Sequence, residues 1–78
     1  MPTLVHGFAP SPAWLRTPAR SRYVHRCQWW EAICSVLTDD NTQHDFFAFG
    51  PSDTSAESRV LREAAAFASR RGRTLDPL

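Results

Sequence analysis

The chain has 78 residues, of which 42% are apolar, and a formal net charge of +1. This length allows one hydrophobic core, so we expect a single domain over residues 1–78, and the apolar content excludes a disordered chain. The near-neutral charge argues against a dedicated nucleic-acid-binding protein, and no apolar run reaches the ~20 residues that cross a bilayer.

The N-terminal segment, residues 1–21, bears arginines and is interrupted by prolines. Residues 3–8 can form a short strand. Residues 11–15 predict one helical turn, because Ser11 suits the N-cap and Pro12 suits the first helical position. Further prolines at Pro10 and Pro18 exclude a long amphipathic targeting helix, so we expect this segment to belong to the mature protein.

Residues 22–50 predict a long antiparallel hairpin. Residues 22–38 form its first strand, residues 39–42 its turn and residues 44–50 its second strand, which ends at Gly50. Strand alternation then places Trp29 and Trp30 on opposite faces. The alternative is a helix over residues 18–37, but arginines at its N-terminus and Asp39 and Asp40 at its C-terminus would both oppose the helix dipole.

A C-terminal helix is predicted over about residues 55–71. Thr54 and Glu57 fit a capping box with Thr54 as the N-cap, and Gly72 suits the end of the helix. Its apolar positions recur at helical spacing and comprise Val60, Leu61, Ala64, Phe67 and Ala68. We therefore expect an α+β fold in which this helix packs on one face of a two- or three-stranded antiparallel sheet, followed by a tail at residues 73–78.

Catalytic and metal-binding motifs are absent from the sequence. His25 and Cys27 share a strand face and His44 could join them, but Cys34 has the opposite parity to Cys27, and no zinc-ligand spacing occurs. No nucleophile elbow or phosphate-binding loop is present, so we expect neither an enzyme nor a cofactor. The two cysteines are too far apart in one strand or helix to form a disulfide, and free thiols suit the cytoplasm.

The charges are segregated along the chain. Residues 1–30 carry four arginines and no acid, residues 31–57 carry six acids and no base, and residues 58–78 are again basic. This predicts either one basic and one acidic surface or ion pairs between the middle and the two ends. All nine basic residues are arginine, which is typical of a GC-rich genome and suggests a bacterial or phage origin.

The adjacent tryptophans predict a binding surface, because one helix can cover only one face of the sheet. The second ring then needs residues 4–16, a homodimer mate or a partner as its cover. By strand parity Arg22 and Arg26 lie beside Trp30, so the predicted binding residues are Arg22, Arg26, Trp29 and Trp30. A secondary acidic patch is predicted at Asp39, Asp40 and Asp45.

These patterns favour a small non-enzymatic protein that occupies the surface of a protein or of a protein–nucleic acid complex. In size and layout it resembles the small phage-encoded inhibitors of host machinery, anti-CRISPR proteins among them, which implies steric blocking. The alternative is a regulator that binds nucleic acid directly through its N-terminal third. In that third, arginines are interleaved with aromatic residues, namely Arg16, Arg20, Arg22 and Arg26 with Trp14, Tyr23, Trp29 and Trp30.

Overall fold

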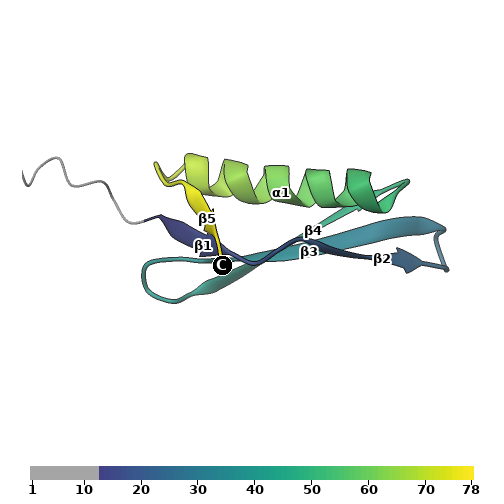
Figure 1. The fold of residues 1–78 in the computed structure, drawn as a ribbon, viewed down its shortest axis with the longest axis horizontal. Helices are drawn as coiled ribbons and strands as arrows, with labels where there is room; N and C mark the ends of the chain where they lie inside the picture. Colours follow the sequence, from purple (N-terminus) through teal and green to yellow (C-terminus); the bar gives the residue numbers. More distant parts are fainter. Residues whose placement is uncertain (1–12) are drawn as a thin grey trace, which may run out of the picture.

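The computed structural model describes residues 13–78, which form an α+β fold of one helix and a mixed five-stranded sheet (Figure 1). In chain order the elements are β1 (Trp14–Arg16), β2 (Arg20–Val24), β3 (Trp29–Leu37), β4 (Gln43–Gly50), α1 (Asp53–Ser69) and β5 (Leu75–Pro77). The sheet is larger than the expected two or three strands. The strand predicted over residues 3–8 lies outside the described residues.

Strand β3 is the centre of the sheet. Along one side it pairs antiparallel with β4, from Trp30 opposite Gly50 to Leu37 opposite Gln43. Along its other side it pairs antiparallel with β2 and then with β1. Strand β5 adds to β1 in parallel, which makes the sheet mixed. The predicted hairpin is thus confirmed for β3 and β4.

Three predictions for the N-terminal half are wrong. Residues 22–38 are not one strand, because the chain reverses in a turn at residues 25–28, where Gln28 adopts a φ of 58°. The helical alternative over residues 18–37 is also wrong, since β2 and β3 occupy most of that range. The predicted helical turn gives way to β1, because Trp14 is buried and its strand pairs with both β3 and β5.

The predicted C-terminal tail is also wrong, because it forms β5. The backbone N–H of Trp14 donates to the carbonyl oxygen of Thr74 at 3.0 Å, and the N–H of Leu78 donates to the carbonyl of Arg16 at 2.8 Å. Leu75 packs against the core. These tertiary contacts order a segment whose own sequence lacks strand periodicity.

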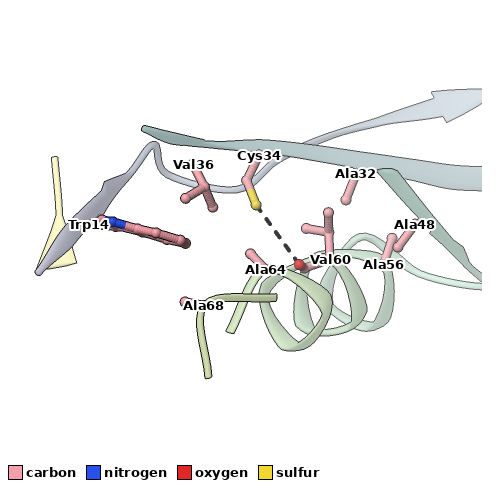
Figure 2. Packing of buried hydrophobic residues seen from close by; sticks show 9 residues of the cluster. All are labelled: Trp14, Ala32, Cys34, Val36, Ala48, Ala56, Val60, Ala64 and Ala68. Atoms are coloured by element: carbon pink, nitrogen blue, oxygen red, sulfur yellow. Dashed lines mark hydrogen bonds between the residues drawn. The ribbon is translucent and has the colours of Figure 1, made fainter. Parts of the chain in front are cut away.

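The core lies between α1 and one face of the sheet, and small side chains build most of it (Figure 2). Its buried members are Trp14, Ala32, Cys34, Val36, Ala48, Ala56, Val60, Ala64 and Ala68. The helix approaches the sheet closely at Gly50, where an added Cβ would lie 2.8 Å from the backbone nitrogen of Ala56. Alanine and glycine are therefore required where the two layers meet, because larger side chains would force them apart.

Helix α1 begins earlier than predicted, with Ser52 rather than Thr54 as its N-cap. The backbone N–H of Ser55 donates to Ser52 Oγ at 3.1 Å, and the N–H of Ser52 donates to Ser55 Oγ at 3.2 Å. This is the reciprocal pattern of a capping box with serine in both positions. The predicted apolar face of the helix is confirmed, with Val60, Ala64 and Ala68 buried.

Replacing Ser52 with alanine is expected to lower the free energy of unfolding by about 1 kcal/mol, because one N-terminal N–H of α1 loses its acceptor. Thr54→Ala is the control, since within residues 13–78 the Thr54 hydroxyl donates a hydrogen bond only to the neighbouring Asp53 carboxylate. Chemical denaturation of both variants measures the difference. A larger loss in Thr54→Ala than in Ser52→Ala would contradict this cap assignment.

Candidate functional site

The sheet has a second face, opposite α1, that no described element covers (Figure 1). We call it the open face. Strand alternation and the pairing registers assign its side chains, because every second residue of each strand points away from the helix. They include Leu15, Arg20, Arg22, Trp29, Glu31, Ile33, Asp45, Phe47 and Phe49.

Large apolar side chains gather on the open face. Phe47 is 53% exposed, Phe49 is 45% exposed and Trp29 is 42% exposed, and Ile33 and Leu15 are also exposed. Of the exposed large apolar side chains within residues 13–78, all but Tyr23 and Leu78 belong to this face. Exposed apolar patches of this kind mark interaction sites in monomeric proteins.

The register arranges the open face in rows across the sheet. One row contains Arg20, Ile33 and Phe47, each directly opposite the next on neighbouring strands. The following row contains Arg22, Glu31 and Phe49 in the same order. Side chains opposite each other on neighbouring strands lie in contact range, so each row presents an arginine on β2 and an aromatic ring on β4.

The charges of the open face balance one another. The guanidinium of Arg22 forms an ion pair with Glu31 at 3.0 Å. Asp45 accepts hydrogen bonds from Ser35 Oγ at 2.6 Å and from Gln43 Nε2 at 2.9 Å, and these two bonds hold the pKa of Asp45 below its ordinary value. With two arginines against two carboxylates, the face is apolar at its centre and carries no net excess of charge.

The four binding residues predicted from the sequence do not form one cluster. Trp29 and Arg22 lie on the open face, whereas Trp30 points to the helix side, where it is half-buried and its ring centroid lies 5.6 Å from that of Tyr23. The two tryptophans thus face opposite sides, as predicted. Arg26 lies in the turn at residues 25–28. The predicted parity of Arg22 and Arg26 with Trp30 is wrong because the chain reverses between them.

Phe47, Phe49 and Ile33 were missed as candidate binding residues. The signal for two of them was present in the sequence, since β4 alternates the large Phe47 and Phe49 with the small Ala48 and Gly50. When the small residues of such an alternating strand face the core, its large side chains lie on the opposite face of the sheet. That pattern indicates a close helix contact on one face and an uncovered apolar surface on the other.

The predicted acidic patch is divided, and its carboxylates serve the fold. Asp39 accepts a hydrogen bond from Trp14 Nε1 at 2.8 Å and forms an ion pair with Arg73 at 2.7 Å. Asp40 accepts hydrogen bonds from Thr38 and Thr42 within the turn after β3, and they lower its pKa to about 2. Two ion pairs join the acidic middle of the chain to its basic ends. Asp39 pairs with Arg73 in the C-terminal basic segment, and Glu31 pairs with Arg22 in the N-terminal one.

The residues considered for a metal site are spread over the fold. Cys27 is exposed in the turn at residues 25–28, whereas Cys34 is buried under α1 with its Sγ 3.9 Å from the carbonyl oxygen of Val60. His44 lies against the ring of Phe67 at 4.9 Å between centroids. No three histidine, cysteine or acidic side chains in the described part of the chain lie close enough to hold a metal ion.

No protein-family model, curated protein or solved structure matches this chain. No helix within residues 13–78 is long and apolar enough to span a bilayer.

The two thiols are expected to differ in reactivity. Burial raises the pKa of the Cys34 thiol and shields it, whereas Cys27 is exposed, and the thiolate is the reactive form. A thiol reagent at neutral pH should modify one cysteine in the folded protein and both after denaturation. The variant Cys27→Ser should show no rapid reaction when folded. Rapid modification of Cys34 in that variant would contradict the packing of α1 on β3.

The turn after β3 is expected to lose stability in acid. The pKa of Asp40 is lowered from its ordinary value of 3.8 to about 2 in the folded protein. Its carboxylate therefore stabilises the fold at any pH above the ordinary pKa. This stabilisation is lost as the pH falls toward the pKa of the folded protein. The difference in unfolding free energy between the natural protein and Asp40→Asn should therefore shrink as the pH falls. A difference that does not change with pH would contradict this role for Asp40.

Proposed function

We propose that this protein is a non-enzymatic binding protein whose open face occupies an apolar surface of a partner protein. The observation that supports it is the set of large apolar side chains on the face of the sheet that no described element covers. Trp29, Ile33, Phe47 and Phe49 face away from the helix, whereas the helix side of β3 and β4 combines small residues such as Ala32, Cys34, Ala48 and Gly50 with Trp30, Val36 and Phe46. The chain thus exposes these four large apolar side chains where its own described elements do not cover them.

The composition of the open face suits a protein interface. Aromatic residues and arginine are the residues that most often anchor such interfaces, and anchors lie at the centre of the buried area with polar groups around them. Here Phe47 and Trp29 supply the apolar anchors, while Arg20 and the Arg22–Glu31 ion pair add polar groups along β2 and β3. Covering the exposed apolar area would contribute roughly 25 cal/mol for each square ångström removed from water.

A protein partner fits this face better than a nucleic acid does. Nucleic-acid binding depends on unpaired positive charge that replaces counterions along the phosphates. On the open face Arg22 is already paired with Glu31, and Asp45 adds a second negative charge. The aromatic residues proposed for the nucleic-acid alternative are also dispersed, because Trp14 is buried and Trp30 faces the helix.

Steric blocking is the form of activity that we propose for this binding. A chain of 78 residues can act on a larger host machine by covering a working surface, which requires no catalytic group. Its composition supports a bacterial or phage origin, and its two unpaired cysteines support a reducing compartment, so we propose that it acts in the cytoplasm. The resemblance in size and layout to phage-encoded inhibitors supports the same proposal.

The test compares Phe47→Ala and Trp29→Ala with Trp30→Ala. The first two side chains are exposed, so both variants should remain folded and should weaken partner binding by roughly thirtyfold, the effect of losing an interface anchor. Trp30 packs against the core, so Trp30→Ala should instead lower the unfolding free energy by about 2 to 4 kcal/mol. The partner is captured with the natural protein, purified, and its affinity for each variant is measured by calorimetry.

Three outcomes would overturn the proposal. Unchanged affinity in Phe47→Ala and Trp29→Ala would place the interface elsewhere. Unfolding of both of these variants would show that another segment of the chain covers the face. A captured nucleic acid whose binding falls steeply with salt would favour the regulator instead, because phosphate contacts depend strongly on salt whereas an apolar protein interface does not.

A further inference from the structure

Strand β4 lies at an edge of the sheet. Among the described strands it pairs only with β3. The N–H of Thr38 donates to the carbonyl of Thr42 at 3.1 Å, and in an antiparallel pair every second residue pair is hydrogen-bonded. Counting from Thr38–Thr42, the residue pairs that are not hydrogen-bonded to β3 are those of Gln43, Asp45, Phe47 and Phe49. The backbone N–H and C=O groups of these four residues therefore point away from β3, toward the outer edge of the sheet. Arg59 confirms the direction, because its Nη1 donates to the outward carbonyl of Phe49 at 2.9 Å.

A groove runs between this edge and α1, and we call it the arginine groove. Two hollows of about 390 and 400 Å³ share Arg62 and Glu63 and follow the seam between the strand and the helix. Its other residues are Phe46, Ala48, Phe49, Arg59, Ala66 and Arg70. Arg62 and Arg70 form no ion pair with any acidic residue in the described range, and Glu63 is the one acid among the groove residues.

We propose that the outer edge of β4 and the arginine groove bind an extended peptide segment in which acidic residues alternate with apolar ones. An exposed edge presents N–H and C=O groups ready to pair with an added strand, and this pairing is a common mode of peptide recognition. Arginine forms strong charge-assisted hydrogen bonds with carboxylates. The segment would thus gain main-chain bonds from β4 and carboxylate contacts from α1.

The alternation follows from the geometry of strand addition. Successive side chains of an added strand point to opposite faces of the sheet. On the helix side they meet the arginine groove, where Arg62 and Arg70 favour carboxylates. On the other side they lie next to Phe47 and Phe49, which favour apolar side chains. The edge therefore selects a pattern of residues as well as an extended backbone.

A second copy of this chain fits the edge less well. If two β4 strands paired antiparallel about a twofold axis, both copies of α1 would lie on the same face of the joined sheet. The two arginine grooves would then face each other across the junction, and like charges at close range are repulsive. An acidic segment from another protein removes this repulsion and instead pairs with the unpaired arginines.

The experiment titrates the full ¹⁵N-labelled chain with a capped peptide as long as β4, in which glutamate and valine alternate. The outward amides of Asp45, Phe47 and Phe49 should shift in the NMR spectrum and exchange more slowly with solvent. Arg62→Glu should weaken the peptide affinity about tenfold or more. Arg26→Glu makes the same change of charge in the turn at residues 25–28, away from the groove, and should alter the affinity little.

Several results would overturn the inference. An equal response to a peptide with lysine in place of glutamate would exclude recognition of carboxylates. Equal weakening by Arg62→Glu and Arg26→Glu would indicate attraction to the overall charge only. Shifts confined to the open-face residues of β2 and β3, or no shifts, would exclude addition to the edge of β4. Self-association through the β4 amides without peptide would identify a second copy as the occupant. None of these results bears on partner binding by the open face, which is tested separately with Trp29→Ala, because Trp29 lies on β3 opposite Val24 of β2 and away from the β4 edge.

Discussion

The close approach of α1 to the sheet is the constraint on which the other features depend. Alanines on both layers and Gly50 at the end of β4 allow this approach, and the backbone of Ala56 leaves no space for a larger residue at Gly50. Side chains on a strand alternate between its faces with a period of two. Once the small Ala48 and Gly50 are assigned to the helix side, the alternating Phe47 and Phe49 of β4 are assigned to the open face.

Because Phe47 and Phe49 face away from the helix, they enlarge the apolar surface of the open face and contribute nothing to the core. The largest fully buried side chains are Val36, Val60 and Cys34, so the interior is modest even for a chain of this length, and small domains have little stability to spare. Phe47 and Phe49 would add apolar burial if they faced the helix. Their position on the uncovered face is costly for an isolated monomer, and this cost is understandable if the face is covered in the working state.

The elements with strong local patterns could be predicted from the sequence, and those set by distant contacts could not. The apolar spacing of Val60, Ala64 and Ala68 predicted α1, and alternation predicted the opposite orientations of Trp29 and Trp30. The turn at residues 25–28 contains no glycine or proline to reveal it. Strand β5 includes Pro77 and is ordered by pairing with β1, far away in the sequence. The cap was misplaced because several neighbouring hydroxyl groups competed for that position.

The pairing of β5 with β1 has a consequence for the order in which the molecule assembles. It joins the first and the last described strands, so it closes a loop that contains every other element, and the entropy cost of loop closure rises with loop length. The parallel pairing of β1 with β5, which we call the β1–β5 ribbon, consists of few residue pairs. In contrast, β3 and β4 are neighbours along the chain and pair over most of their length. Folding should therefore begin at the β3–β4 hairpin and end at β5. Spontaneous opening should start from the same ribbon, which makes the two ends of the described chain its least protected part.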